Sequence, residues 1–126
     1  MTNGRIEHVN ITVTDPKRSA DLMRDLFGWK VRWEGPSMLG GHTIHVGNDE
    51  DYLALYTNED MQAADPQFAK GKPLNHVGVV VDDLDAVERE VIAAGLEPFN
   101  HDDYEPGRRF YFFDWNGIEF EIVSYA

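Results

Sequence analysis

One short segment of this 126-residue chain occurs twice. Residues 6–13 read "IEHVNITV" and residues 74–81 read "LNHVGVVV", so a histidine stands third in each copy. Both segments alternate and are rich in β-branched residues, which predicts two half-buried strands. An internal repeat restricts the fold more than any local pattern does, because both copies must adopt the same succession of elements.

The repeat extends over most of the chain. At an offset of 68 His8 aligns with His76, and after one deletion Gly28 aligns with Gly95 at an offset of 67. In each copy the first strand is followed by a helical pattern and then by three short strand patterns. These three strands are expected near residues 29–34, 42–47 and 52–57 in the first copy, and near 97–101, 108–114 and 117–124 in the second.

Each predicted helix is marked by its ends and by its apolar face. In the first copy Asp15 is the expected N-cap, Pro16 takes the first helical position, and Gly28 follows the last turn. Apolar side chains at spacings of three and four are expected to face the sheet: Leu22, Met23, Leu26 and Phe27 in the first helix, and Val87, Val91 and Ile92 in the second.

These patterns predict an α+β fold with two tandem βαβββ modules, which form a curved mixed sheet around a central groove. Module one spans about residues 5–57 and module two about residues 74–124, and the polar, turn-rich segment 58–73 is the expected linker. A chain of this length is expected to form a single domain. A groove between two related half-sheets is a natural place for a ligand.

The composition limits the partners and the chemistry. The chain has 11 basic and 23 acidic residues and a net charge of −12, which disfavours nucleic acids and anionic membranes as partners. It has no cysteine, which excludes disulfides, zinc–thiolate sites and thiol nucleophiles. The pattern of a signal peptide and that of a membrane helix are both missing, so the sequence predicts a cytoplasmic location.

The alternation along each strand predicts which side chains face the groove. The residues expected against the helices are Val9, Ile11, Val13, Leu53, Leu55, Val77, Val79, Val81, Ile118, Phe120 and Ile122. The residues expected on the groove side are His8, Asn10, Thr12, Tyr52, Ala54, Tyr56, His76, Gly78, Val80, Glu119, Glu121 and Val123.

Four of the groove positions are related by the repeat. They are His8 and Ala54 in the first module and His76 and Glu121 in the second. Three of them carry metal-binding side chains, and the fourth carries only a methyl group. Two imidazoles and one carboxylate with open coordination positions form a facial triad, which binds a divalent cation and leaves room for substrate or water. The sequence favours this site over a metal-free groove that merely contains polar residues.

The duplicated unit, with the segments "HVNITVTD", "NHVGVVVDD" and "FYFFDWNGIEFEIV", resembles the vicinal oxygen chelate superfamily. That superfamily includes glyoxalase I, extradiol ring-cleaving dioxygenases, fosfomycin-modifying enzymes and bleomycin-binding proteins. The resemblance implies His8, His76 and Glu121 as metal ligands, Fe2+, Mn2+, Ni2+ or Zn2+ as the cofactor, and a homodimer. Glyoxalase I enzymes usually supply a fourth ligand, which Ala54 cannot provide, so the pattern fits the three-ligand enzymes better.

The segment "RFYFFDWNGIEFE" adds candidates for the reaction. Arg109, Tyr111 and Phe113 alternate onto one face, which the hairpin is expected to place beside Glu121. In the extradiol dioxygenases that the chain resembles, a tyrosine ten residues before the glutamate ligand lies in the active site, and Tyr111 has this spacing. Those enzymes also have a catalytic histidine upstream, for which His101 is near but one residue out of register.

The expected function is that of a metal-dependent enzyme in which two adjacent oxygens of a small oxygen-rich or aromatic substrate chelate the cation. The catalytic candidates are Tyr111, Glu119 and His101, and the candidates for substrate binding are Arg109, Asn10, Tyr52, Tyr56 and Phe113. A glyoxalase-like lyase or isomerase is one alternative. Another is a metal-free small-molecule binding protein of the bleomycin-resistance type, with aromatic side chains such as Trp29 and Trp33 as stacking surfaces. His42 and His45 are expected to be surface residues and not ligands.

Overall fold

The computed structural model describes residues 3–60, 74–104 and 107–125. The elements in these ranges are β1 (His8–Thr12), α1 (Pro16–Phe27), β2 (Lys30–Ser37), the 3-10 helix η1 (Met38–Gly40), β3 (Gly41–Gly47), β4 (Tyr52–Thr57), β5 (Val77–Val80), α3 (Leu84–Ala93), β6 (Phe99–Tyr104), β7 (Gly107–Phe113) and β8 (Glu119–Ser124). The contacts divide the chain into two compact units, Met1–Asp65 and Pro66–Ala126. This boundary falls within the expected linker, most of which lies outside the described residues.

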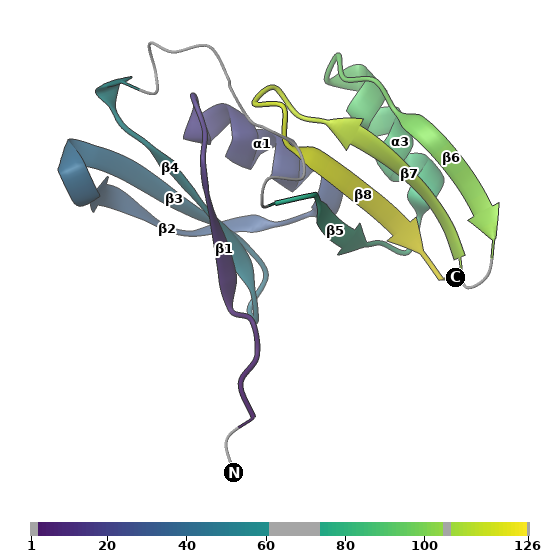
Figure 1. The fold of residues 1–126 in the computed structure, drawn as a ribbon, viewed down its shortest axis with the longest axis horizontal. Helices are drawn as coiled ribbons and strands as arrows, with labels where there is room; N and C mark the ends of the chain where they lie inside the picture. The colour runs from purple at the N-terminus through teal and green to yellow at the C-terminus, as the bar shows by residue number, and fades with distance from the viewer. Residues whose placement is uncertain (1–2, 61–73, 105–106, 126) are drawn as a thin grey trace. The chain divides into compact units, whose positions relative to one another are not determined.

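Both units have the same sheet topology (Figure 1). The strand order is β1-β4-β3-β2 in the first unit and β5-β8-β7-β6 in the second. In each sheet the first strand runs parallel to its neighbour, and the other pairs are antiparallel. The predicted α+β fold with two βαβββ modules is therefore confirmed. The predicted central groove would lie between the two units. The structure describes each unit by itself, so the groove stays a prediction.

The strand registers confirm the repeat at single-residue resolution. Asn10 lies opposite Ala54 in the first sheet, and Gly78 lies opposite Glu121 in the second. These two pairs are related by the offsets of 68 and 67 that the sequence predicted. The positions in one unit can therefore be compared directly with those in the other.

Helix α1 begins and ends where its sequence predicts. The Asp15 side chain accepts a hydrogen bond from the backbone N–H of Arg18 at 3.1 Å, and Gly28 follows the helix with a left-handed φ of 70°. A β-carbon is disfavoured in that conformation, so glycine suits the position.

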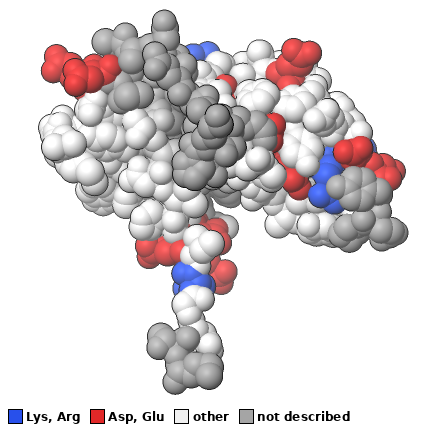
Figure 2. Space-filling view, in the orientation of Figure 1, with Lys and Arg blue, Asp and Glu red and all other residues white. Residues whose placement is uncertain are grey.

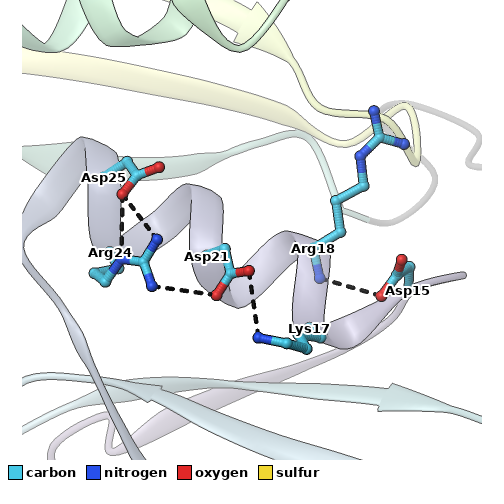
Figure 3. A network of polar contacts seen from close by, with 6 residues as sticks. All are labelled: Asp15, Lys17, Arg18, Asp21, Arg24 and Asp25. Atoms are coloured by element: carbon cyan, nitrogen blue, oxygen red, sulfur yellow. Dashed lines mark hydrogen bonds and ion pairs between the residues drawn. The ribbon is translucent and has the colours of Figure 1, made fainter.

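The outer side of α1 carries a row of ion pairs (Figure 3). Lys17 and Arg24 both reach Asp21, at 3.5 and 3.4 Å, and Arg24 also contacts Asp25 at 3.1 Å. All of these side chains are exposed, so each pair contributes at most about 0.5 kcal/mol. The network therefore marks the solvent side of the helix and adds little stability.

The core of each unit lies between its helix and its sheet. Helix α1 packs mainly on β3 and β4, and α3 packs on β7 and β8. The buried apolar side chains include Ile11, Val13, Leu22, Met23, Leu26, Leu53 and Leu55 in the first unit, and Leu84, Val87, Val91, Phe110, Phe112, Ile118, Phe120 and Ile122 in the second. This set confirms most of the predicted core, and Val77, Val79 and Val81 are half-buried.

Two predicted core residues are exposed instead. Val9 is 36% exposed and stands near the start of the edge strand β1, whereas Ile11, two residues further along the strand, is buried. Ile92 is 56% exposed because the buried stripe of α3 runs through Leu84, Val87 and Val91. One further residue turns the helix by about 100°, which carries Ile92 to the side of that stripe.

A tight turn joins β7 to β8, as the segment "DWNG" predicts. The buried Asp114 carboxylate accepts hydrogen bonds from the backbone N–H groups of Asn116 and Ile118, both at 2.9 Å, and Gly117 adopts a φ of 80°. Burial raises the pKa of Asp114 above its ordinary value, although these hydrogen bonds oppose the shift. The turn fixes the hairpin register that places Tyr111 opposite Glu121.

The charges are spread in small groups over the face drawn in Figure 2. Most of the described residues on that face are uncharged, and Lys and Arg side chains stand beside some of the acidic groups. Within the described ranges, the helices are all too short or too polar to cross a membrane.

Candidate functional site

The second unit brings two of the predicted metal ligands into contact. His76 stands just before β5, and Glu121 lies in the neighbouring strand β8. His76 Nε2 is 3.2 Å from Glu121 Oε1, and Arg109 Nη1 donates to Glu121 Oε2, also at 3.2 Å. The side chains of Glu121 and Arg109 are only 15% and 11% exposed. The carboxylate is thus held between an imidazole and a guanidinium group in a partly desolvated place.

Further polar and aromatic side chains surround this contact. Glu119 Oε2 lies 3.6 Å from His76 Nδ1, and the Tyr111 ring meets the His76 ring edge-to-face with centroids 5.9 Å apart. Phe99 stacks on Tyr111 and also on Phe113, at centroid distances of 6.0 and 5.2 Å. Strand alternation places these β7 and β8 residues on the face of the sheet away from α3. The predicted association of Tyr111, Arg109 and Phe113 with this face agrees with the strand register.

The first unit carries a column of rings on the corresponding face. His8 stacks on Tyr52 with centroids 4.9 Å apart, and Tyr52 stacks on His45 at 4.5 Å. Trp33 continues the column, with its centroid 5.1 Å from that of His45. The Arg32 guanidinium carbon lies 4.5 Å from the centroid of the Tyr52 ring, which is within the range of a cation–π contact.

Burial and nearby charged groups shift pKa values in and beside this column. Glu7 Oε1 lies 2.9 Å from His8 Nδ1 and accepts a hydrogen bond from the Tyr52 hydroxyl at 3.3 Å; the contact with His8 is the main cause that lowers the pKa of Glu7. Burial is the main cause that raises the pKa of Tyr52. The pKa of His45 is lowered, mainly by burial and then by the positive charges of His8 and Arg32.

His45 is a candidate functional residue that the sequence analysis placed at the surface. It is half-buried in the ring column, and it lies opposite Ala54 just as Tyr111 lies opposite Glu121. At an offset of 66 residues His45 aligns with Tyr111. An alignment of the two copies over this strand would therefore have identified His45 as a candidate site residue.

The contact between His76 and Glu121 fits a shared cation. Zinc sites have metal–ligand bonds of about 2.0–2.2 Å, which put two neighbouring ligand atoms about 3 Å apart. The 3.2 Å between Nε2 and Oε1 is close to that distance. Among the described residues no three His, Asp or Glu side chains are grouped so that they could hold a metal ion alone. His8 belongs to the other unit, so the structure does not relate it to this pair.

The remaining predicted site residues lie in different surroundings. Asn10 is exposed on β1, and the buried Tyr56 donates its hydroxyl hydrogen to the backbone oxygen of Met38 at 2.9 Å. His101 Nε2 is 2.8 Å from Glu88 Oε1, on α3, and its ring stacks on Phe110. His101 therefore contacts the helix side of the second sheet and does not join the cluster around Glu121.

His42 makes its contact outside the ring column of its own unit. Its Nε2 is 3.2 Å from Glu34 Oε2, and both side chains are exposed. Ala54, the fourth position related by the repeat, is buried and offers no ligand atom.

A family model identifies the class of protein to which this chain belongs. The model of the Glyoxalase/Bleomycin resistance protein/Dioxygenase superfamily matches residues 5–122. The chain belongs to this superfamily, as the resemblance in its sequence implies. None of the curated proteins matches its sequence.

Solved structures share the fold at low sequence identity. A glyoxylase/bleomycin resistance protein/dioxygenase domain from Frankia sp. EAN1pec is 20% identical, with a TM-score of 0.82 and 98% of each chain covered. The fosfomycin resistance protein FosX from Listeria monocytogenes, in a complex with Mn(II) and sulfate, is 15% identical, with a TM-score of 0.74, 98% of this chain and 93% of that chain covered. A glyoxalase I mutant from Zea mays is 19% identical, with a TM-score of 0.76, 94% of this chain and 45% of that chain covered.

Proposed function

We propose that this protein is a divalent-metal-dependent enzyme that acts on a small oxygen-rich or aromatic substrate, and that His8, His76 and Glu121 hold the metal. The observation that carries the proposal is the 3.2 Å contact between His76 Nε2 and Glu121 Oε1. The FosX structure that contains Mn(II) lends support from a protein of similar fold.

The hydrogen bonds of His76 explain why this contact calls for a cation. Nδ1 lies 2.8 Å from the side-chain oxygen of Asn75, and an amide oxygen can only accept a hydrogen bond. Nε2 faces the Glu121 carboxylate, which also only accepts, so both ring nitrogens of His76 face acceptors while a neutral imidazole has one N–H group. One of the two contacts is therefore favourable only if a further positive charge is present. Either a second proton or a metal ion supplies that charge, and the two compete for the same site.

The residues around the pair have distinct roles in this proposal. Arg109 holds Glu121 through Oε2, which leaves Oε1 for the metal. Glu119 lies on the Nδ1 side of His76, so we assign it a supporting role there in place of the general base considered from the sequence. Tyr111 stands edge-on to His76 and opposite Glu121, where its hydroxyl is suited to donate a hydrogen bond to negative charge on the substrate.

Metal chemistry and shape define the class of substrate. A divalent cation held by three ligands polarises two adjacent substrate oxygens as a Lewis acid. Phe99 and Phe113 offer apolar ring surface beside Tyr111, which suits an aromatic or otherwise flat substrate. We propose a reaction of the extradiol type over a glyoxalase-like isomerisation because Ala54 supplies no fourth ligand.

Metal binding tests this proposal directly. The protein is purified without chelator for metal analysis, and chelator-treated protein is then titrated calorimetrically with Mn2+, Fe2+ (without oxygen), Ni2+ and Zn2+. We expect one site per chain, and we expect the His76→Ala variant to lose it. The His42→Ala variant is the control, since His42 lies in the first unit and pairs there with the exposed Glu34. If His76→Ala binds the cations as tightly as the parent, the proposed ligand set is wrong. Light scattering of the same samples tests the homodimer that we also propose.

A second candidate function is that of a metal-free binding protein for flat aromatic molecules. The ring column of the first unit favours it, because Trp33 is an exposed indole at one end of that column. Such a protein would show no saturable binding of any of the four cations, and it would bind planar aromatic compounds with an affinity that Trp33→Ala weakens. Saturable metal binding that depends on His76 rejects this alternative.

A further inference from the structure

The residue before each repeated histidine makes the same contact in both units. Glu7 Oε1 lies 2.9 Å from His8 Nδ1, and Asn75 Oδ1 lies 2.8 Å from His76 Nδ1. Glu7 and Asn75 occupy equivalent positions of the repeat, at the offset of 68. The two side chains differ in charge and length, yet both present an oxygen to Nδ1.

The chemistry of these acceptors fixes the imidazole tautomer. An ionised carboxylate and an amide oxygen accept hydrogen bonds and do not donate them, so the hydrogen in each contact belongs to Nδ1. A neutral imidazole has only one N–H group, so Nε2 of His8 then carries the lone pair. In the second unit both ring nitrogens of His76 face an acceptor, Asn75 at Nδ1 and Glu121 at Nε2, so the contact with Asn75 leaves Nε2 to the proton or cation that Glu121 attracts.

Tyr52 reinforces the arrangement in the first unit. Its hydroxyl donates to the same Glu7 Oε1 atom at 3.3 Å, and its ring stacks on His8 with an interplanar angle of 14°. Tyr52 thus contacts both Glu7, which accepts the hydrogen bond, and the His8 imidazole that Glu7 orients. In the second unit the side chain of Glu119, which is equivalent to Tyr52 at the offset of 67, lies 3.6 Å from Nδ1 of His76.

We propose that Glu7 and Asn75 are positioning residues that hold Nδ1–H of the following histidine and so make Nε2 of both His8 and His76 the metal-binding atom, with Tyr52 clamping the pair in the first unit. The statement about metal binding rests on the proposed function. The statement about the tautomer does not, because it concerns the metal-free protein. Loss of the hydrogen-bond partner of a metal-binding histidine typically lowers metal affinity by about 10- to 100-fold.

The other histidines provide an internal comparison for the tautomer. Nε2 of His42 faces Glu34 at 3.2 Å, and Nε2 of His101 faces Glu88 at 2.8 Å, so the same reasoning gives these two rings a proton on Nε2. Two-bond 1H–15N correlation spectra of the chelator-treated, 15N-labelled protein near pH 8 report the tautomer of each ring. We expect the Nδ1–H form for His8 and the Nε2–H form for His42 and His101. A His8 ring in the Nε2–H form would overturn the proposal.

Variants and Zn2+ test the second half. We expect Glu7→Leu and Asn75→Leu each to weaken Zn2+ binding by about 10- to 100-fold. We expect Asn75→Asp, which keeps an acceptor, to stay within a few-fold of the parent, and Glu34→Leu is the control. In the Zn2+-loaded parent, both His8 and His76 should keep the proton on Nδ1. Affinity that is unchanged in both leucine variants contradicts the positioning role.

The two readouts separate this inference from the proposed function. If His8 shows the Nδ1–H form but the parent binds none of the cations, the metal proposal fails and the orientation of the ring stands. If the parent binds Zn2+ but His8 has its proton on Nε2, the metal site stands and the positioning roles of Glu7 and Tyr52 are wrong.

Discussion

The substitution Glu121→Gln tests the centre of the proposed site with the smallest change in shape. The carboxylate accepts a charge-assisted hydrogen bond from Arg109 Nη1, and its other oxygen faces His76 Nε2, both at 3.2 Å. A hydrogen bond to a charged group contributes about 1.5–3 kcal/mol, and one between neutral groups contributes about 1 kcal/mol. The glutamine oxygen still accepts from Arg109, but the negative charge beside this 11%-exposed guanidinium is lost.

These values give an expected result for stability and for metal binding. The free energy of unfolding of the metal-free protein should fall by about 0.5–2 kcal/mol, measured by urea denaturation in the presence of chelator. Metal affinity should fall by at least about 100-fold, which is about 2.8 kcal/mol, because the site loses its only anionic ligand. Calorimetric titration with Mn2+ and Zn2+ measures this loss.

The pair of Glu34 and His42 offers a matched control. It has the same 3.2 Å distance between a carboxylate oxygen and Nε2, but its side chains are 56% and 45% exposed. Glu34→Gln should therefore change the free energy of unfolding by less than about 1 kcal/mol and leave metal affinity unchanged. If Glu121→Gln and Glu34→Gln bind metal equally well, Glu121 is not a ligand and the reasoning from its contacts fails.

Three further predictions follow from the same geometry. Ala54→Glu places a carboxylate relative to His8 as Glu121 stands relative to His76, so calorimetry should show at least about tenfold tighter metal binding, at a cost of about 1–3 kcal/mol in urea unfolding for the larger buried side chain; an unchanged affinity would refute the equivalence. Burial lowers the pKa of His45, so its NMR titration midpoint should lie below 6.5, and a midpoint at or above 6.5 contradicts this. Because the unfolded chain binds more protons than the folded protein in this range, the stability linked to His45 should be present above pH 6.5 and be lost as the pH falls through the folded pKa. Asp114→Ala removes the acceptor of two backbone N–H groups in the β7–β8 turn, so urea unfolding should show a loss of about 2–4 kcal/mol, and a loss below about 0.5 kcal/mol would show that the turn does not depend on these hydrogen bonds.

The sequence was sufficient to predict the two βαβββ modules and to assign several residues around Glu121 to one face of the sheet. The offset of 68 pairs the two histidine-bearing strands, and the period of two along a strand assigns most faces. The same period, with the turn at 114–117, predicted that Tyr111 and Glu121 would share a face. These features depend on local geometry and on the equivalence of the two copies, both of which can be read along the chain.

The positions that differ from prediction are those where local periodicity breaks or where packing selects among similar residues. The register of the β6–β7 pair shifts between Phe99 and Asp102, so alternation does not place His101, which contacts α3. His45 lies on the predicted strand, but its half-buried place in the ring column depends on Trp33 and Tyr52, which come from two other strands.

The hydrogen-bond partners of the two repeated histidines show the same difference between what the sequence predicts and what the tertiary structure decides. The sequence supplies an oxygen-bearing residue before each histidine, Glu7 in one copy and Asn75 in the other. Which ring nitrogen receives that oxygen depends on the rotation of the imidazole, and neighbouring strands fix that rotation through Tyr52 in one unit and through Glu121 in the other. Repetition and alternation can be read from the order of residues along the chain, whereas the orientation of a side chain is set by contacts between residues that are distant in sequence.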